Sequence, residues 1–455
     1  MTALRSPGAR TATRLRNVEL LLLLTAGAVS LAAVALVQLG ALGRIEAGFL
    51  QLSAIPLVLA FAMHLTMRFV TPTADPFFLP IMTALSGLGI AEIYRIDLHY
   101  GYSGWGSTSV RQIVWCAIAI VCAILTLVVI RNVQVLNRYT YTVGLVAFAL
   151  LLLPLLPGIG KTVSGARAWI GIGAFSFQPG ELAKIALAAF FAGYLMRHRD
   201  ALSLLGHRFL GMRFPRVRHL GPVVLVWLLS ILVVILQHDL GPGLLYFGIF
   251  LIVIYVATGR IGWLAIGGVL IVLGGAAANA ALTYVHLRFA NWLTPFDQHV
   301  YDADGGSFQL VQGLFGIAHG GVIGTGLGQG QPWVTPVSQS DYIFASLGEE
   351  LGLAGLFAII CLYLLFTFRG LRIGFDSADD FGALLAVGLS FGVALQAFII
   401  IGGVTRVIPL TGLTTPFLAA GGSSLIANWI IGALLLRLSS VCRLPQRLQG
   451  VGAAS

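Results

Sequence analysis

Long apolar segments alternate with short polar ones along almost the whole chain. The apolar segments run for roughly 17 to 25 residues, the length that a helix needs to cross the hydrocarbon core of a bilayer. Such a segment must be helical, because lipid offers no partners for backbone N–H and C=O groups. The pattern predicts about twelve transmembrane helices, over residues 18–40, 50–70, 76–93, 111–130, 139–157, 180–196, 221–237, 240–257, 262–284, 350–368, 381–403 and 421–438.

The longest polar interval, residues 284–350, lies between two of these predicted helices. It contains an acidic stretch over 297–304, a glycine-rich segment over 320–330 and a Gly-Glu-Glu motif at its end. Because apolar segments flank it on both sides, the whole interval must lie at one membrane surface. We expect the chemistry of the protein there.

The composition agrees with this pattern. Hydrophobic residues make up 58% of the chain and charged residues only 10%, whereas a soluble domain has about 25% charged residues. We therefore predict an all-α polytopic membrane protein. Its expected organisation is a basic cytoplasmic N-terminus over 1–17, a transmembrane domain over 18–438 with extracytoplasmic loops at 158–179 and 285–349, and a cytoplasmic tail over 439–455.

The distribution of Lys and Arg predicts the orientation, since cytoplasmic loops carry an excess of these residues close to the helix ends. With the N-terminus inside, 19 of the 27 basic residues fall on the inner side and the other 8 on the outer side. Both termini are then cytoplasmic, and the 284–350 interval is outside. The formal net charge of +10 is explained by inner loops that meet anionic membrane lipids, so we expect no nucleic acid partner.

The only two lysines, Lys161 and Lys184, both fall on the outer side, where positive charge is otherwise rare. Gln178, Glu181 and Lys184 recur at i, i+3 and i+6 on one face of the helix that Pro179 opens. Ionisable groups at membrane depth are usually functional, which favours a binding site for a negatively charged group. The alternative is an ion pair between Glu181 and Lys184 that only closes the mouth of the helix.

The stretch from Gly165 to Lys184 resembles the outer-loop signature of the shape, elongation, division and sporulation (SEDS) family, which includes RodA, FtsW and SpoVE. In that family it reads Asn-Gly-Ala-x-Arg-Trp-Ile, then Gln-Pro-Ser-Glu and a Lys three residues on. This chain has Ser164 for the Asn, Ala168 for the Arg and Gly180 for the Ser, and Arg167 stands one place before the missing arginine.

Four further motifs follow in the family's order. Residues 237–241 resemble Gln-Pro-Asp-Leu-Gly, and residues 308–328 resemble Tyr-Gln-x-x-Gln followed by Gly-x-Gly-x-Gly. Residues 341–352 are a near match to Asp-Phe-Ile-Phe-Ala-x-x-Gly-Glu-Glu-Leu-Gly, and residues 409–424 match the closing signature. Five motifs in the right order are specific. Members usually have a ten-helix core, so the first two helices here would be an N-terminal addition.

The resemblance implies a peptidoglycan glycosyltransferase of the bacterial cell membrane that polymerises lipid II into β-1,4-linked glycan strands for cell elongation or division. It implies a class B penicillin-binding protein, which is a transpeptidase, as a partner. The short termini favour the RodA type. The motif residues and the outer-side cations give the expected substrate-binding set: Lys161, Arg167, Trp169, Gln178, Glu181, Lys184, Arg288, Gln309, Asp341, Glu349, Thr411 and Ser423.

The resemblance also implies a general base, an Asp six residues before the Tyr-Gln pair, that deprotonates the attacking hydroxyl. Counting back from Phe308 gives Asp302. The Pro that follows the Asp in the family is Ala303 here, so Asp304 and Asp297 stay as alternatives. A solvated acidic loop without a catalytic role is the remaining interpretation.

Asp302 and Asp304 together supply two hard oxygen ligands of the kind that Mg²⁺ or Mn²⁺ takes. The Asp-x-Asp spacing is similar to the metal-holding motif of other glycosyltransferases. The motif is too short to be specific, so we assign no cofactor and leave a divalent cation open. A leaving pyrophosphate needs cations or hydrogen-bond donors in any case, and bidentate Arg contacts suit its oxygens best.

Two other functions fit parts of the pattern. A lipid II translocase, or flippase, would also have many spans and a basic outer mouth, but the polar groups concentrate on one face and no inverted repeat is visible. A noncatalytic membrane scaffold for a cell-wall transpeptidase is the third hypothesis. Replacing Asp302 by Asn separates the three, since only a glycosyltransferase would lose polymerisation.

Overall fold

The structure is a computed structural model that describes residues 7–163, 165–172, 175–203, 205–209, 212–215 and 221–442. The chain forms two compact units. Unit 1 comprises Met1–Val133, Gly316–Ala378 and Pro416–Ser455, and unit 2 comprises Gln134–Phe315 and Asp379–Thr415. Each unit therefore joins segments that lie far apart in the sequence.

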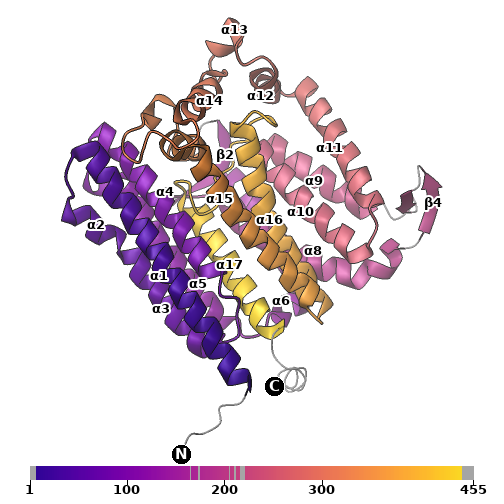
Figure 1. Cartoon of the computed structure of the whole chain (residues 1–455). Coiled ribbons are helices and arrows are strands. Elements are labelled where there is room, and N and C mark those ends of the chain that lie inside the picture. Colours follow the sequence, from indigo (N-terminus) through magenta and orange to yellow (C-terminus); the bar gives the residue numbers. More distant parts are fainter. Residues whose placement is uncertain are drawn as a thin grey trace, which may run out of the picture. The chain divides into compact units, whose positions relative to one another are not determined.

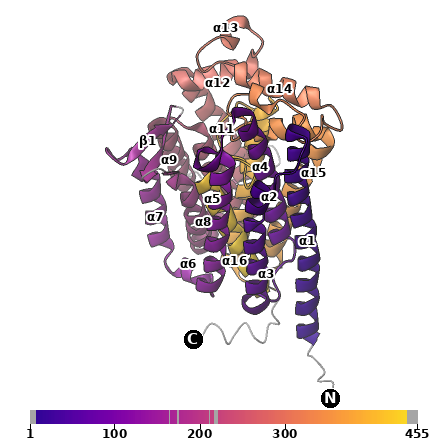
Figure 2. The same ribbon diagram turned by 90° about the vertical axis from the view of Figure 1, so that its left-hand side faces the viewer.

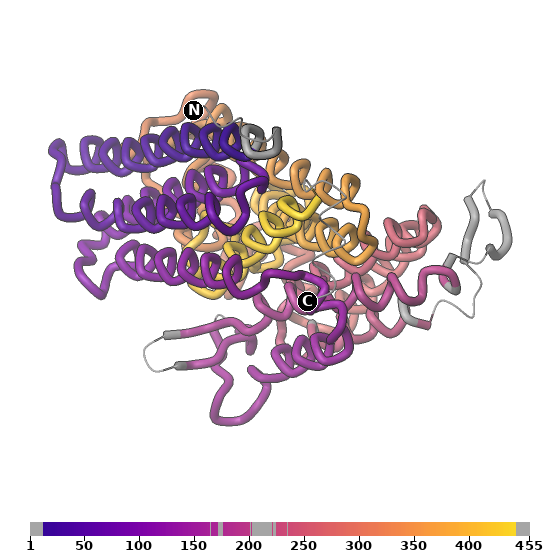
Figure 3. The backbone as a smooth tube through the Cα atoms, turned by 90° about the horizontal axis from the view of Figure 1, so that it is seen from below, coloured from indigo at the N-terminus to yellow at the C-terminus, as the bar shows by residue number. Residues whose placement is uncertain are grey.

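Unit 1 is a bundle of long helices (Figure 1). Its elements are α1 (Pro7–Leu42), α2 (Ala47–Ser53), α3 (Ile55–Val70), α4 (Phe78–Tyr100), η1 (Gly104–Gly106), α5 (Thr108–Val129), η4 (Pro332–Val334), α15 (Ile343–Asp376) and α17 (Gly422–Cys442). In Figure 3 the tubes of the first long helices of this unit, α1, α3, α4 and α5, run side by side.

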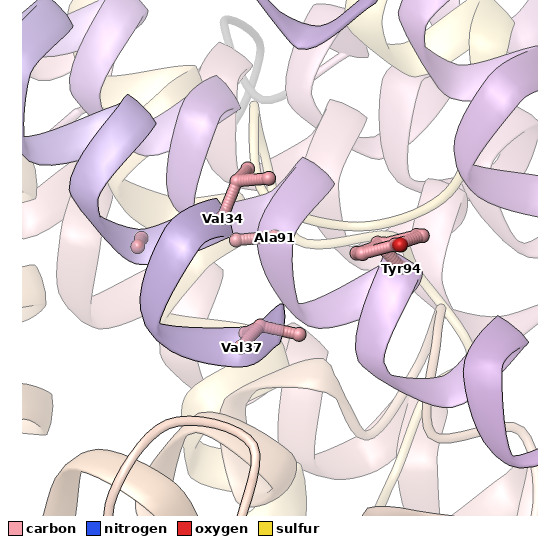
Figure 4. Packing of buried hydrophobic residues seen from close by; sticks show 5 residues of the cluster. Val34, Val37, Ala91 and Tyr94 are labelled. Atoms are coloured by element: carbon pink, nitrogen blue, oxygen red, sulfur yellow. The ribbon is translucent and has the colours of Figure 1, made fainter. Parts of the chain in front are cut away.

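Small, β-branched and aromatic side chains form the contact between α1 and α4 (Figure 4). Val34 and Val37 of α1 cluster with Ala91 and Tyr94 of α4. The Tyr94 ring stacks on Phe49, with 3.6 Å between the ring centroids. Lipid gives no hydrophobic driving force for helix association, so close van der Waals packing of this kind holds membrane helices together.

Helix α15 is kinked at Gly352, whose φ of 67° and ψ of −173° are open to glycine alone. An added Cβ there would lie 2.3 Å from the backbone nitrogen of Gly324. Next to the kink the glycine-rich segment 320–330 folds back on the helix, and the N–H of Thr325 donates to the carbonyl of Glu349 at 3.0 Å. The glycines therefore serve close backbone packing beside the Gly-Glu-Glu motif.

Unit 2 is built around α8, α10 and α16, and Figure 2 shows α7 and α8 standing side by side. Helices α12 and α13 lie at one end of its long helices (Figures 1 and 2). Helix α14 (Phe308–Gly320) crosses the boundary to unit 1. Besides α14, unit 2 comprises α6 (Gln134–Arg138), α7 (Thr140–Leu152), η2 (Leu153–Leu155), β1 (Gly160–Val163), β2 (Ala166–Ile172), β3 (Phe175–Phe177), α8 (Pro179–Ser203), β4 (Leu205–Phe209), β5 (Met212–Pro215), α9 (Gly221–Gln237), α10 (Leu240–Thr258), α11 (Gly262–Ala281), α12 (Thr283–Leu293), α13 (Gln298–Tyr301) and α16 (Asp380–Val404).

Residues 158–179, which the sequence predicted as a loop in an all-helical chain, contain a small antiparallel sheet of order β1-β2-β3. Lys161 pairs with Trp169, and Ile170 pairs with Phe177. The β-branched and aromatic residues of this stretch suit a pleated surface. The strands β4 and β5 form a second antiparallel pair. The predicted helical class is thus confirmed, and two short sheets are present in addition.

All twelve predicted spans are helical, and nine helices within the described residues are long and apolar enough to cross a membrane. The other three are α7 and α9, which are short, and α8, which carries Glu181 and Lys184 near its start. The polytopic membrane class is therefore confirmed, whereas the count of twelve spans stays a prediction.

The interval 285–349 is more ordered than the predicted loop. It holds α12, α13, α14 and η4, and α15 already begins at Ile343. These helices are shorter than a membrane span or polar at their ends, so a search for long apolar segments does not find them.

Candidate active site

Two aspartates bracket the short helix α13. Asp297 is its N-cap, and the Asp297 Oδ1 accepts a hydrogen bond from the backbone N–H of His299 at 2.9 Å, a common structural role for this residue type. Asp302 is the C-cap, and its Oδ2 accepts a hydrogen bond from Gln298 Nε2 at 2.6 Å. Asp302 and Asp304 are both exposed, and the described residues give neither an ion-pair partner.

The turn that carries Asp302 is tied to the elements on both sides. The N–H of Ser307 donates to the carbonyl of Val300 at 3.0 Å, and the Ser307 hydroxyl donates to the carbonyl of Pro295 at 2.6 Å. Asn291 Nδ2, on α12, donates to the carbonyl of Gly305 at 2.9 Å. The acidic turn is thus held in one shape before a substrate arrives.

Helix α14 supplies the glutamines of the Phe308–Gln312 motif. Gln312 Nε2 donates to the Tyr301 hydroxyl at 3.0 Å, and the ring of Tyr301 meets Phe308 edge-on at 5.4 Å. Gln309, the predicted site residue, is half-buried. The motif therefore positions the α13 turn through Tyr301 and Gln312, a role that the sequence did not assign.

Arg288 lies on α12 against the segment that follows α16. Its Nη1 donates to the carbonyl of Leu410 at 2.7 Å, and its guanidinium lies next to Gly412. The neighbouring Thr411 is 5% exposed, and its hydroxyl has no hydrogen-bond partner in the described chain. A buried hydroxyl of this kind costs free energy unless something bonds to it, so Thr411 and Arg288 together offer donors for a ligand.

Helix α12 is anchored through Arg406, another of the cations that the sequence predicts on the outer side. Arg406 Nε donates to the carbonyl of Trp292 at 2.9 Å and its Nη2 to the carbonyl of Leu293 at 3.0 Å, while Trp292 Nε1 donates to the Arg406 carbonyl at 3.1 Å. A positive charge at the last carbonyls of a helix is favourable. The Arg406 guanidinium therefore has a structural role, because it stabilises the C-terminal end of α12.

Tyr284 opens the same helix. Burial raises the pKa of its phenol to about 12, and the Asp239 carboxylate acts in the same direction, although the Arg288 guanidinium opposes them. The phenol therefore stays protonated at neutral pH and well above it.

Lys184 is buried, with 1% of its surface exposed, and is held by two helices. Its Nζ lies 2.7 Å from Glu181 Oε2 on α8 and 2.7 Å from Gln396 Oε1 on α16. Gln396 Nε2 in turn donates to the carbonyl of Thr414 at 2.9 Å. The predicted alternative, an ion pair between Glu181 and Lys184, is present, and Gln178 lies buried just before them.

Lys161, Arg167 and Trp169 lie on the small sheet. Lys161 and Arg167 are exposed and Trp169 is half-buried. Ser164, which stands for the family's Asn, lies outside the described residues. The two exposed cations are available to an anionic ligand.

Asp341, Glu349 and Ser423 belong to unit 1, and the remaining predicted site residues belong to unit 2. Glu349 is buried; its Oε1 accepts from the backbone N–H of Gln331 at 3.0 Å and lies 3.1 Å from His319 Nδ1. Ser423 is fully buried and its hydroxyl has no hydrogen-bond partner in the described chain. Asp341 is half-buried.

Within the residues that the structure describes, no three His, Cys, Asp or Glu side chains are grouped so that they could hold a metal ion. Asp302 and Asp304 alone offer two carboxylates, and Mg²⁺ held by so few protein ligands is usually shared with substrate phosphates. The question of a divalent cation therefore stays open, as it was from the sequence.

These observations define a multi-pass α-helical membrane protein. Its polar interval, residues 284–350, is ordered and presents the accessible carboxylate of Asp302. The family model for the cell cycle proteins FtsW, RodA and SpoVE matches residues 76–443. The chain belongs to this family. The match begins after α3, at the end of the helices that the sequence indicated as an N-terminal addition.

Similar proteins extend over most of the chain. The peptidoglycan glycosyltransferases RodA of Mycobacterium bovis and Mycobacterium tuberculosis are 41% identical over 95% of this chain and 92% of their own length. The stage V sporulation protein E of Bacillus subtilis is 34% identical over 73% of this chain and 87% of its own length. The family resemblance read from the motifs is thereby confirmed.

Two solved structures share the fold. One, from a study of polymerization and crosslinking by a peptidoglycan synthase complex, has a TM-score of 0.64 at 24% identity and covers 82% of this chain and 99% of its own. The crystal structure of the rod shape determining protein RodA of Thermus thermophilus has a TM-score of 0.54 at 21% identity and covers 82% and 98%.

Proposed function

We propose that this protein is a peptidoglycan glycosyltransferase that polymerises lipid II into β-1,4-linked glycan strands at the outer face of the cytoplasmic membrane. The mycobacterial relatives carry the name of this activity and cover nearly the whole chain. In each round, the 4-hydroxyl oxygen of an acceptor N-acetylglucosamine bonds to C1 of a donor N-acetylmuramic acid. The bond from C1 to the pyrophosphate breaks, and undecaprenyl pyrophosphate leaves.

Asp302 is the proposed general base, and one observation carries this assignment. Its carboxylate is exposed and held by Gln298, and no basic side chain among the described residues neutralises it. Such a group can accept the proton of the attacking hydroxyl as the new bond forms, a contribution of roughly 10² to 10⁴ in rate. Asp297 is less suitable because its oxygen already caps α13.

The leaving pyrophosphate needs positive charge and hydrogen-bond donors. Arg288 donates to the carbonyl of Leu410, and the next residue, Thr411, has a buried hydroxyl without a hydrogen-bond partner in the described chain. A guanidinium carries five N–H donors, and the bond to Leu410 leaves several for phosphate oxygens. Lys161 and Arg167 are exposed, whereas Lys184 already has two partners. We infer that Arg288 and Thr411 bind the pyrophosphate. Lys184 contributes indirectly, because its contacts with Glu181 and Gln396 stabilise the structure of the site.

The excess of Lys and Arg in the other set of loops supports an extracytoplasmic position for α12, α13 and α14 and a cytoplasmic position for both termini. A lipid-linked substrate reaches such a site from the outer leaflet. The protein would therefore be a multi-pass protein of the bacterial cytoplasmic membrane with its chemistry outside.

The proposed partner is a class B penicillin-binding protein. Glycan strands must be crosslinked after polymerisation, and one solved structure of similar fold comes from a complex that the study describes as coordinating polymerization and crosslinking. A transpeptidase bound to this chain would place the two reactions on the same strand.

The test is a lipid II polymerisation assay with purified wild-type protein, Asp302→Asn and Asp304→Asn, with glycan strands separated on a gel. Asp302→Asn is expected to lower the rate by about 100-fold or more, and Asp304→Asn by only a few-fold. The Asp302 side chain is exposed, so equal thermal unfolding of both variants excludes a folding defect.

Two further measurements, of lipid II movement across a vesicle bilayer and of transpeptidase binding, separate the other two hypotheses. A translocase would move labelled lipid II across a vesicle bilayer without making polymer, and Asp302→Asn would leave this movement unchanged. A scaffold would make no polymer by itself and would still bind a transpeptidase. Polymerisation at full speed by Asp302→Asn would show that another residue is the base.

A further inference from the structure

Glu92 lies in the interior of α4, a helix that is long and apolar enough to cross a membrane. Its side chain is fully buried, and neither of its carboxyl oxygens has a hydrogen-bond partner in the described part of the chain. Buried polar groups in native proteins almost always have a partner. An ionised carboxylate that is buried without one costs so much free energy that the group takes up a proton instead.

The charged groups around Glu92 make ionisation still less favourable. Helix α15 packs against α4, and the Glu350 carboxylate is the charged group that acts most strongly on Glu92. The Arg95 guanidinium comes second and the Glu349 carboxylate third. Two carboxylates that lie close together are not readily ionised at the same time. The surroundings of Glu92 thus combine two further acidic side chains with one guanidinium.

The Arg95 guanidinium is bound to other acceptors. Its Nε donates to Glu350 Oε1 at 3.2 Å, and its Nη2 donates to the carbonyl of Gly330 at 2.8 Å. The same guanidinium lies 4.6 Å from the ring centroid of Trp333. These contacts hold Arg95 at Glu350, so Glu92 receives no hydrogen bond from it.

The other two acidic side chains have donors of their own. Glu350 Oε2 accepts from the backbone N–H of Gly328 at 2.9 Å, in addition to the bond from the guanidinium. Glu349 Oε1 accepts a backbone N–H at 3.0 Å and lies 3.1 Å from His319 Nδ1. Hydrogen bonds of this kind stabilise the ionised form of a carboxyl group. Among these three side chains, Glu92 alone lacks a donor, so it is the one that should carry a proton.

We propose that Glu92 is a proton-binding site, occupied at neutral pH, whose carboxylic acid donates a hydrogen bond to the Glu350 carboxylate. A carboxylate has about four lone-pair sites, so Glu350 can accept this bond besides those from Arg95 and Gly328. A carboxylic acid that an apolar site keeps neutral can act as a donor in this way. A metal ion suits the site less well, because no three His, Cys, Asp or Glu side chains of the described residues are grouped to hold one.

The proton would connect α4 to the place where the glycine-rich segment 320–330 packs on α15. There the N–H of Gly326 donates to the carbonyl of Glu350 at 3.0 Å. Loss of the proton would set the negative charges of Glu92 and Glu350 against each other at this contact. Alkaline pH should therefore loosen the glycine-rich segment. This inference does not depend on the proposed glycosyl transfer.

Infrared spectroscopy of the purified full chain detects a protonated carboxyl group directly, through its carbonyl stretch. In a detergent without ester groups at neutral pH, the wild type should show a band that shifts in D₂O and is lost in Glu92→Gln. The matched control is Glu46→Gln, because the Glu46 side chain is 45% exposed and pairs with Arg44 at 2.8 Å. This control should keep the band. Identical spectra of the wild type and Glu92→Gln would show that Glu92 is ionised and would overturn the proposal.

Unfolding at different pH values is the second measurement. In the unfolded chain Glu92 is ionised above about pH 5, so unfolding of the wild type would release a proton that Glu92→Gln does not hold. The unfolding constant of the wild type, relative to that of Glu92→Gln, should therefore rise about tenfold per pH unit between about pH 5 and 7. The stabilising effect of the proton is thus largest at low pH and is lost as the pH rises.

At neutral pH, Glu92→Gln should be at least as stable as the wild type, because its amide keeps a donor for Glu350. Glu46→Gln should show the same pH dependence as the wild type. A ratio of the two unfolding constants that does not change with pH would overturn the proton site. Wild-type stability that follows added Na⁺ or Mg²⁺ and not pH would overturn it as well, and would show that a metal cation neutralises Glu92.

Discussion

Lys184 and Gln396 are 212 residues apart in the sequence, yet the Lys184 ammonium donates to the Gln396 side-chain oxygen at 2.7 Å in the interior of unit 2. Glu181 lies at the same distance from the ammonium, and both lysine partners are buried. The charge of Lys184 is therefore balanced within the protein. Lys184 therefore primarily stabilises the structure of the site, and it affects substrate binding through that structure.

Removal of Lys184 should destabilise the fold. Lys184→Met leaves the buried Glu181 carboxylate without its cation, which typically costs about 3–5 kcal/mol. Glu181→Gln with Lys184→Met removes both charges and should recover most of this loss. Thermal unfolding of the purified proteins measures the difference, and a single variant as stable as the wild type would contradict the structural role.

The two aspartates of α13 should behave differently. Asp297→Ala removes an N-cap, a change worth about 1 kcal/mol, and should lower activity a few-fold by loosening the turn that carries Asp302. Asp302→Asn should leave thermal unfolding unchanged and lower the rate of polymerisation by about 100-fold or more. The opposite ranking of the two variants in the lipid II assay would move the base to Asp297.

Thr411 offers a test of the proposed pyrophosphate contact. Its hydroxyl is buried without a partner, so Thr411→Val should leave stability unchanged or raise it by about 1 kcal/mol. If the hydroxyl bonds to the substrate, kcat/KM should fall by about tenfold. Thr405→Val is the control, because the Thr405 hydroxyl already donates to the carbonyl of Ile401. A Thr411→Val variant with the kcat/KM of the wild type would remove Thr411 from the site.

The kink of α15 should depend on Gly352. A Cβ at this position would meet the backbone of the glycine-rich segment, and its φ of 67° disfavours any other residue. Gly352→Ala should therefore cost about 1–3 kcal/mol or more. Gly268→Ala in α11, where an added Cβ has nothing within 4 Å, should be neutral or slightly stabilising. Equal melting temperatures for the two variants would contradict the prediction that the kink of α15 requires glycine at position 352.

Cysteine labelling tests the orientation. In a background without the native cysteines, Asp304→Cys should react in intact cells with a maleimide that cannot cross the membrane. Arg131→Cys should react only after the membrane is opened, because the distribution of Lys and Arg predicts that residue 131 lies on the cytoplasmic side. Labelling of position 304 from the cytoplasmic side alone would contradict the proposed topology and place Asp302 away from an extracytoplasmic substrate.

Much of the fold could be predicted from the sequence because the membrane imposes a simple rule. A span must be long, apolar and helical, so all twelve predicted segments are helices in the structure. Motif order also predicted the family correctly. The Glu181 and Lys184 pair was foreseeable as well, since residues three apart on a helix face each other.

The sequence could not decide which acidic residue of the 297–304 stretch is free for chemistry. The structure narrows the choice, because Asp297 is used as a cap while Asp302 and Asp304 are exposed. It also shows that the predicted loops contain a sheet and three short helices. Short elements of this kind carry too little periodic signal to stand out beside membrane spans.

The sequence by itself thus determined the class, the helical segments and the local pairs, all of which depend on neighbours along the chain. Only the tertiary structure decided three hydrogen bonds: Lys184 donates to Gln396, Arg288 donates to the carbonyl of Leu410, and Arg406 donates to the carbonyl of Trp292 at the end of α12. These contacts join residues more than 100 positions apart. Their partners are set by how the helices pack, which no local pattern records.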